Sequence, residues 1–278
     1  MSAAWKARLR CPSCGSAVTP GPEAVACSCG IRYPVRGGVP IFHEGDGFEG
    51  TGDLMARIKL KIKSCPPLFS LLYWASGAFV GTRADAAVRG LPAGALILNL
   101  GSGAKKVRED ALNVDAHPFP GVAVVADAAK LPFQDASVDA VVCESLLEHV
   151  EDPDAVAREI ARVLKPGGLA YVLTPFMLGF HSSPSDYKRW TMPGLRRLFP
   201  DFEETGGGVA FGPTVAFNYM LASWLSLPLS LGSAKLHQLL SAGLNALLAP
   251  LSLLDWVFAL HPSAEDFSLA IYFMGTRR

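Results

Sequence analysis

The stretch "ILNLGSGAKK", residues 97–106, decides how the middle of the chain folds. An apolar, strand-like run leads into a turn that contains Gly101 and Gly103. Glycine lets the backbone turn sharply and approach a ligand closely, so both glycines are candidate ligand contacts. A nicotinamide site would require a third glycine at position 106, where this chain has Lys106, so the stretch does not match that class of site.

Outward from this turn, short apolar runs alternate with helical ones between residues 94 and 175. The strand-like runs read "ALILNL", "ALNVD", "VAVVAD", "VDAVVCE" and "GLAYVLTP". A helix is predicted over 153–164, with Asp152 as its N-cap, Pro153 in its first turn, and Pro166 with two glycines after its end. Near-continuous apolar strands between helices are typical of an α/β fold with a parallel sheet buried on both faces.

Carboxylates follow the predicted strands at the points where these strands end. The second strand ends at Asp115, which is placed to accept hydrogen bonds from both hydroxyls of a ribose. The third ends at Asp127, which could accept from an adenine amino group while the amide of Ala128 faces a ring nitrogen. The fourth ends at Glu144. We therefore expect a nucleoside-binding site at the carboxyl edge of the sheet.

Two longer motifs follow in order: "DAAKLPFQDASVD" (127–139) and "LEHVEDP" (147–153). With the glycine turn, they resemble class I S-adenosylmethionine-dependent methyltransferases of the small-molecule type, and the resemblance covers roughly residues 94–200. It implies a Rossmann-like seven-stranded sheet of order 3-2-1-4-5-7-6 whose last strand is antiparallel. It also implies S-adenosylmethionine bound above the carboxyl ends of strands 1 to 4, by Asn99, Gly101, Gly103, Asp115, Asp127, Ala128 and Glu144.

The chain departs from this family at two positions of the first motif. The family usually has an acid where Asn99 stands, and a glycine where Lys105 stands. The short spacing between Leu100 and Leu112 is barely enough for a parallel crossover, so we expect the first helix to be short or missing. A catalytically degenerate relative that serves as a cofactor-binding scaffold or membrane partner is therefore an alternative.

Downstream, "FHSSPSDYKRWTMPGLRRLFP" (180–200) is similar to a stretch found after the fifth strand in some of these methyltransferases. The candidate catalytic residues are His149, His181, Asp186 and Tyr187, any of which could take a proton from an acceptor hydroxyl. Alternatively, Tyr187, Arg189 and Trp190 fix a loop that covers the cofactor, and positioning alone supports methyl transfer.

The N-terminal stretch contains "CPSC" (11–14) and "CSCG" (27–30). Two cysteine pairs with a short spacer match a tetrahedral zinc site formed by Cys11, Cys14, Cys27 and Cys29. The following "CGIRYPVRGGVP" resembles the Trm112-like zinc-ribbon family, which implies structural zinc. A ribbon that has lost its metal and a redox pair are the alternatives.

The segment 214–262 is the most apolar part of the chain, and we expect it to insert as a helical hairpin before the last strand. Three interpretations remain: a soluble lid, an interfacial anchor in one membrane leaflet, or a membrane-spanning pair of helices. Pro228, Pro250 and scattered polar residues argue against the spanning pair. Lysines 59, 61 and 63, in a predicted helical segment over 54–80, are compatible with an anionic surface.

The predicted domains are a zinc ribbon (1–42), a linker and helical cap (43–80), and a methyltransferase domain (81–278). Lys and Arg total 25 and Asp and Glu total 25, a balance that argues against nucleic acid as a partner. Residues 1–10 lack an apolar signal-peptide core, which predicts a cytoplasmic protein, with possible association with the inner face of the membrane. We expect methylation at oxygen or carbon of a small or lipid-linked acceptor; an RNA-modifying enzyme is the rival hypothesis.

Overall fold

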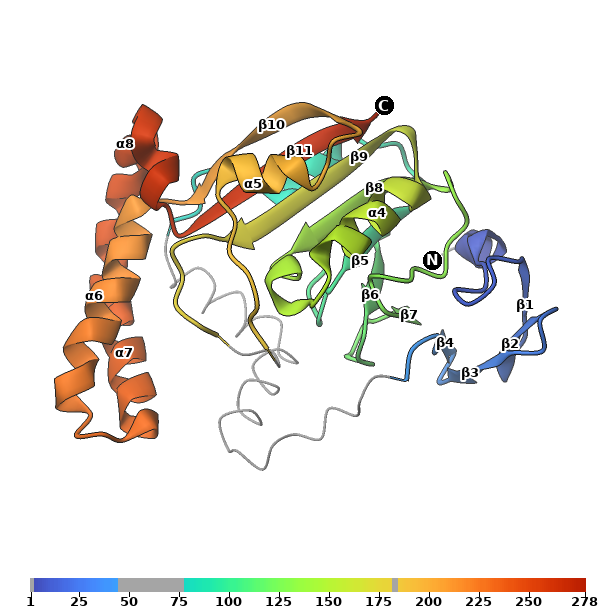
Figure 1. The fold of residues 1–278 in the computed structure, drawn as a ribbon, viewed down its shortest axis with the longest axis horizontal. Helices are drawn as coiled ribbons and strands as arrows, with labels where there is room; N and C mark the ends of the chain where they lie inside the picture. The colour runs from blue at the N-terminus through green and yellow to red at the C-terminus, as the bar shows by residue number, and fades with distance from the viewer. Residues whose placement is uncertain (1–2, 45–77, 182–184) are drawn as a thin grey trace.

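The computed structural model describes residues 3–44, 78–181 and 185–278 (Figure 1). Most of the predicted linker and cap, with its three lysines, lies outside the described residues. At the end of that segment, the helix prediction is wrong for residues 78–80. Phe79 forms an antiparallel bridge to Phe211, and the Val80 amide donates to the carbonyl of Ala210 at 2.9 Å. The adjacent strand offers backbone partners that a helix could not use.

The central sheet contains seven strands in the order β10-β11-β9-β8-β5-β6-β7. With β5 counted as strand 1 and the sheet read from its β7 edge, this order is 3-2-1-4-5-7-6. The strands from β5 to β9 pair in parallel, and β11 runs antiparallel between β9 and β10. Their bounds are β5 Ile97–Leu100, β6 Leu112–Asp115, β7 Val124–Val125, β8 Val138–Glu144, β9 Leu164–Pro175, β10 Phe202–Phe211 and β11 Ala270–Arg277.

The two faces of this sheet are covered by different helices. Helices α4 (Pro153–Val163) and α5 (Met192–Arg197) cover one face, and α3 (Ala84–Arg89) contributes to the apolar cluster on the other. Successive side chains of a strand point to opposite faces of the sheet, so Leu98 lies in the first cluster and Ile97 in the second. The chain therefore buries two apolar layers around one sheet.

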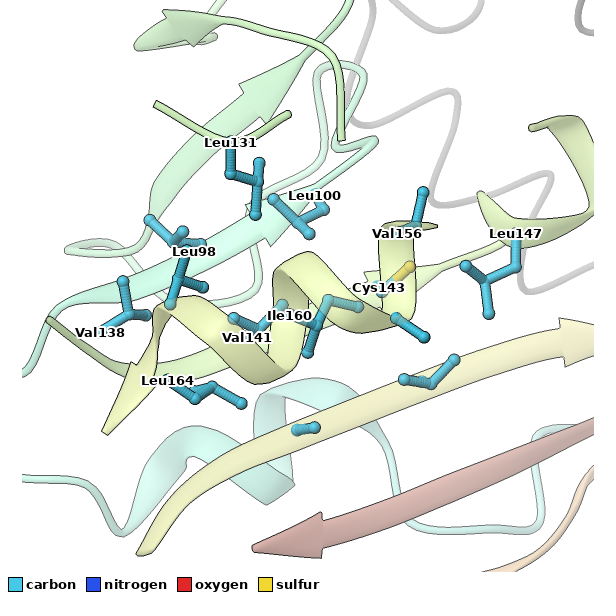
Figure 2. Close-up of a cluster of buried hydrophobic side chains, with 14 of the residues drawn as sticks. Leu98, Leu100, Leu131, Val138, Val141, Cys143, Leu147, Val156, Ile160 and Leu164 are labelled. Carbon is cyan, nitrogen blue, oxygen red and sulfur yellow. The ribbon is translucent and has the colours of Figure 1, made fainter. Parts of the chain in front are cut away.

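Helix α4 shows why the first layer forms. The Asp152 carboxylate accepts from the Ala155 amide at 2.9 Å, and Pro153 occupies the first turn, as predicted. Val156 and Ile160, one turn apart, are fully buried against β5 and β8, as Figure 2 shows. The helix ends at Val163, and the chain continues directly into β9. This packing holds the carboxyl end of β8 in place.

The connection from β5 to β6 contains no helix, and the structure describes every residue between Leu100 and Leu112. The expectation of a short or missing first helix is confirmed. The Arg108 side chain fills part of this region, and its Nη1 donates to the carbonyls of Val88 and Leu91 at 2.9 and 3.0 Å. The glycine turn is consequently held by a compact loop.

The N-terminal unit is a four-stranded antiparallel sheet of order β1-β2-β3-β4, preceded by the short 3-10 helix η1 (Ala3–Arg8). It docks at the β7 edge, where Ile41 forms a parallel bridge to Val125 and Leu9 an antiparallel one to Phe133. Arg10 also pairs with Asp135 at 2.8 Å. The strands are β1 Val18–Pro20, β2 Ala24–Cys27, β3 Arg32–Arg36 and β4 Val39–Pro40.

The apolar segment before the last strand is helical, as predicted. Helices α6 (Pro213–Leu229) and α7 (Ala234–Leu248) form a helical hairpin that stands beyond the carboxyl ends of β8 and β9 (Figure 1). The chain returns through η3 (Ala249–Leu254), α8 (Asp255–Phe258) and η4 (Pro262–Phe267). Asp255, fully buried, accepts from the amides of Thr214 and Val215 and so caps α6.

Candidate functional site

The glycine turn after β5 has the geometry of a close-approach loop. Gly101 and Gly103 have φ of 63° and 52°, in the left-handed region that favours glycine. A methyl group added at Gly101 would lie 3.0 Å from Cδ1 of Leu146, whereas one added at Gly103 would meet no atom within 4 Å. Gly101 therefore allows the turn to pack against the end of β8, and Gly103 leaves the outer side of the turn open.

The two carboxylates predicted to bind a nucleoside lie at the ends of β6 and β7. Asp115 accepts from the amides of Gly103 at 2.8 Å and of His117 at 3.0 Å. Asp127 accepts from the amide of Ala129 at 2.8 Å, and Ala128 lies between these two residues, half-buried. Asp115 is thus held by one amide of its own loop and one of the glycine turn, and Asp127 by an amide of its own loop, as expected for side chains that must keep a fixed orientation toward a ligand.

Asn99 stabilises the glycine turn through hydrogen bonds within the protein. Its Nδ2 donates to the carbonyl of Lys105 at 2.9 Å and to Oδ1 of Asn113 at 3.0 Å, and its side chain is buried. Lys105, in turn, reaches across the turn and pairs with Glu144 at 2.5 Å. The two departures from the family motif are therefore linked, because Asn99 holds the backbone of the residue whose side chain meets Glu144.

Near the carboxyl end of β8, Glu148 and His149 lie in the short helix η2 (Leu147–His149). Nε2 of His149 and Nε2 of His181 each lie 3.9 Å from Oε1 of Glu148, and the two rings are edge to face at 4.9 Å between centroids. Burial raises the pKa of Glu148 to about 7. Burial and the neighbouring His149 ring lower the pKa of His181.

The remaining predicted residues, Asp186 and Tyr187, have different surroundings. Asp186 forms a two-point ion pair with Arg189, which lowers the pKa of Asp186 to about 2. It also accepts from the His181 amide at 2.9 Å, so it orients that histidine. The Tyr187 hydroxyl instead donates to Glu151 at 3.3 Å, and the side chain is 49% exposed. The structure brings His149, His181 and Asp186 together and leaves the Tyr187 hydroxyl apart.

The helical hairpin contributes Tyr219 to this region. The described residues 176–181 and 185–191, between β9 and α5, are called the acceptor loop here. A methyl group added at Gly179, in this loop, would lie 3.4 Å from Cε1 of Tyr219. Burial raises the pKa of the Tyr219 hydroxyl, which interacts electrostatically with Arg189 and Asp186. The base of the hairpin therefore borders the candidate acceptor site.

The four N-terminal cysteines converge as the sequence predicted. All four sulfur atoms lie within 4.8 Å of one another, with Cys14 and Cys27 at 3.4 Å and Cys11 and Cys29 at 3.9 Å. Two tight turns achieve this: the Gly15 amide donates to the carbonyl of Cys11, and the Gly30 amide to that of Cys27. Both glycines have positive φ, so the C-x-C pair reaches the same point as the C-x₂-C pair.

Sequence reasoning missed Glu148 and Lys105 as members of the site. Lys105 was identified only as a departure from the family motif, and Glu148 only as part of a family motif. A glutamate directly before a histidine, at the carboxyl end of a buried strand, was the available signal. Its burial depends on the acceptor loop, whose Tyr187 amide donates to the Glu148 carbonyl at 2.7 Å.

Comparison with known proteins supports the architecture. Residues 99–172 match the family described as "Methyltransferase domain". A protein from Mycobacterium sp. (strain JLS) named "Uncharacterized methyltransferase" is 32% identical over 121 residues, which cover 37% of this chain and 48% of that protein. A Mycobacterium tuberculosis (strain CDC 1551 / Oshkosh) protein named "Probable S-adenosylmethionine-dependent methyltransferase" is 46% identical over 63 residues, covering 22% of this chain and 23% of that protein.

Among solved structures, the [4+2]-cyclase SpnF is similar with a TM-score of 0.47 and 15% identity, covering 79% of this chain and 94% of that one. The chain spans about half or less of the length of the curated relatives named here. The region that matches the family, 99–172, includes the end of β5, the glycine turn, β6 to β8 and most of β9. Residues 99–172 thus resemble a methyltransferase domain, and they lie on a Rossmann-like sheet.

Proposed function

We propose that the chain is an S-adenosylmethionine-dependent methyltransferase. The observation that carries the proposal is the juxtaposition of the open turn at Gly103 with Asp115, whose carboxylate already accepts from the Gly103 amide at 2.8 Å. Asp127 lies at the end of the neighbouring strand, β7. Open parallel sheets bind nucleotides at this edge, and the family match covers the same residues.

The residues present fit this cofactor. Asp115 would accept from the ribose hydroxyls, Asp127 and the Ala128 amide would recognise the adenine, and the Gly101–Gly103 turn would allow close approach of the backbone. Asn99 fixes the Lys105 backbone, and the pair of Lys105 with Glu144 would border the amino-acid end. When bound, S-adenosylmethionine supplies an electrophilic methyl group, and the protein supplies orientation and exclusion of water.

The acceptor is proposed to be a small or lipid-linked molecule methylated at oxygen or carbon. His149 and His181 border the acceptor side and are suited to accept a proton from an acceptor hydroxyl. Asp186 positions His181 through its backbone amide. An RNA acceptor remains the rival hypothesis, and the balanced charge of the chain argues against it. Candidate acceptors can be compared by transfer of label from the methyl group of the cofactor.

The cofactor site is tested by equilibrium dialysis with labelled S-adenosylmethionine. Asp115→Ala should bind about 10- to 100-fold more weakly, since hydrogen bonds to a charged group contribute about 1.5–3 kcal/mol. Asp154→Ala, an exposed acid on α4, is the matched control and should bind like the wild type. Equal affinity of Asp115→Ala and wild type would show that Asp115 does not hold the ribose. No binding by any of the three proteins would overturn the proposed function.

We also propose that the helical hairpin contacts a membrane surface at the cytoplasmic face. Helix α7 has no buried residue, and the helical run Ala234–Phe258 is long and apolar enough to cross a bilayer. Trp224, Leu239 and Leu247 are 67%, 69% and 74% exposed. An apolar exposed surface beside the acceptor loop suits an enzyme that takes a lipid-linked acceptor from a leaflet.

Flotation with anionic liposomes tests this contact. Joint substitution of Trp224, Leu239 and Leu247 by serine should reduce the bound fraction severalfold, because it removes exposed apolar area without touching the core. Ile31→Ser, which changes an exposed apolar residue of the N-terminal unit, should leave binding unchanged. Undiminished binding of the triple variant would reject the hairpin as the contact. Proteolysis of the bound protein distinguishes an interfacial hairpin from a spanning one.

For residues 1–42 we propose a Trm112-like ribbon with structural zinc. The close approach of four sulfurs supports a closed tetrahedral site, and so small a unit gains much of its stability from metal. Elemental analysis should find one zinc fewer per chain in Cys29→Ser than in wild type, while Cys143→Ser, which changes a buried cysteine of β8, should match wild type. Equal zinc in Cys29→Ser and wild type would reject this ligand set.

A further inference from the structure

Among the described residues, the buried carboxyl group of Glu148 has no hydrogen-bond partner. Its side chain is 0% exposed, and neither Oε1 nor Oε2 has a partner among the described residues. By contrast, Asp186, 2% exposed, is paired with Arg189 at two points. A buried carboxylate with no partner is costly, so native proteins pair such a group with donors or a cation. The surroundings of Glu148 therefore point to a ligand that satisfies it.

Two imidazole rings converge on this carboxylate from different segments. Nε2 of His149 and Nε2 of His181 each lie 3.9 Å from Oε1 of Glu148. One ligand atom from each of the three residues lies within 4.8 Å of the others. Ligand atoms around a tetrahedral zinc ion with bonds of about 2.0–2.1 Å stand roughly 3.4 Å apart. Small side-chain rotations would bring the three atoms to that spacing.

The opposite nitrogens of both rings are oriented by oxygen atoms. Nδ1 of His149 lies 2.6 Å from the carbonyl oxygen of Ser185, which can only accept, so Nδ1 carries the hydrogen of that bond. In the neutral ring, Nε2 then carries the lone pair that a metal requires. Nδ1 of His181 lies 3.3 Å from Oδ2 of Asp186. Oxygen contacts of this kind, to the ring nitrogen that does not bind the metal, fix the orientation of metal-ligating histidines in proteins.

We propose that Glu148, His149 and His181 bind a divalent first-row transition-metal ion such as Zn²⁺. Two imidazole nitrogens with one carboxylate oxygen form a ligand set of catalytic zinc sites, whereas Mg²⁺ and Ca²⁺ favour sites composed of oxygen atoms. Three protein ligands leave at least one position open. That position is suited to an oxygen atom of the acceptor, a hydroxyl or a carbonyl.

The position of this metal site relates it to the proposed reaction. Leu146 directly precedes η2 and packs against Gly101, so the site adjoins the glycine turn. A metal ion there would orient an acceptor oxygen and lower the pKa of a bound hydroxyl. Metal binding itself does not depend on the cofactor, and it can fail or succeed independently of the proposed methyl transfer.

Zinc counting tests the site. Wild type, Glu148→Gln, His181→Ala and the control Asp154→Asn are each equilibrated with Zn²⁺, desalted and analysed for zinc per chain. Both site variants should carry one zinc fewer than wild type, and the control should match it. The cysteine site contributes equally to all four proteins, so it cancels in the comparison. The same zinc content in Glu148→Gln, His181→Ala and wild type overturns the proposal.

A second measurement separates loss of metal from loss of fold. Added Zn²⁺ should raise the melting temperature of the wild type more than that of Glu148→Gln, because an ion bound only by the folded state stabilises it. Both proteins should unfold cooperatively in chelator. Glutamine keeps the shape of glutamate, and His181→Ala provides an independent variant on another segment. An equal Zn²⁺-induced shift in Glu148→Gln and wild type would overturn the proposal.

Discussion

Asp115 and Asp127, on the proposed cofactor side of the site, differ from Glu148, on the proposed acceptor side, in their hydrogen bonding. Asp115 accepts from the backbone amides of Gly103 and His117, and Asp127 accepts from the amide of Ala129. Glu148, a few residues past the end of β8, is fully buried and accepts none among the described residues. Backbone amides thus already satisfy Asp115 and Asp127, whereas the buried carboxylate of Glu148 is left for a ligand to satisfy.

One edge of the sheet thus combines a preorganised half with a half that depends on a ligand. Preorganisation lowers the cost of binding, because the loops are ordered beforehand. An unsatisfied buried group has the reverse effect: it destabilises the ligand-free protein and favours the state that contains the ligand. Substitutions at the two sides should therefore differ in the sign of their effect on stability.

The largest effect is expected for Gly101→Val. The positive φ of Gly101 is unfavourable for a β-branched residue, and the new side chain would collide with Leu146. The free energy of unfolding should fall by about 3 kcal/mol or more, measured by urea denaturation. Gly103→Ala is the control at the open side of the turn and should cost less. If the two variants are equally stable, the close packing of the turn against the end of β8 is wrong.

A smaller effect of opposite sign is expected for Glu148→Gln in chelator. The pKa of Glu148 is raised to about 7, so its ionisation disfavours the folded state as the pH rises from about 4.5 through 7. The variant should be about 1–3 kcal/mol more stable than wild type at pH 8, and the advantage should vanish near pH 4. Denaturation at both pH values checks this. A variant less stable than wild type at pH 8 would contradict the unsatisfied charge.

Asp115→Asn makes the equivalent change on the cofactor side. Asparagine retains one acceptor oxygen but presents an amide where the second backbone N–H donates, so one of the hydrogen bonds from Gly103 and His117 is lost. The unfolding free energy should fall by about 1–2 kcal/mol at pH 8. An increase, as expected for Glu148→Gln, would remove the contrast between the two sides.

The smallest effect is expected for Asp127→Asn. This side chain accepts one backbone hydrogen bond, from Ala129, and the amide oxygen of asparagine can keep it. Stability should change by about 0.5 kcal/mol or less. A loss as large as that of Asp115→Asn would show that the β7 turn depends on the charge of Asp127 itself.

The elements that could be predicted from the sequence are those marked by a few neighbouring residues. Asp152 and Pro153 identified the start of α4, and the short spacing from Leu100 to Leu112 indicated the missing helix. Strand β10 was not recognised from its residues, because it begins "FEETGGG" and glycines and exposed acids are poor strand formers. It forms because β11 pairs with it along its length.

The site was predicted only in part, because only some of its residues follow from local signals in the sequence. Strand-end acids such as Asp115 follow from the chain order, since parallel strands end at one edge. The surroundings of Glu148 depend on His181 and the acceptor loop, which are distant in sequence and meet only in the fold. Residues 78–80 were predicted as helix because their apolar composition resembles that of the preceding segment, and pairing with β10 overrides that preference.

The central claim, that this carboxyl edge binds S-adenosylmethionine, is tested most directly by titration calorimetry of the wild-type chain with that cofactor. We predict saturable heat with one site per chain, with Asp115→Ala giving much weaker binding under the same conditions. Absence of saturable binding to folded wild-type protein would contradict the account.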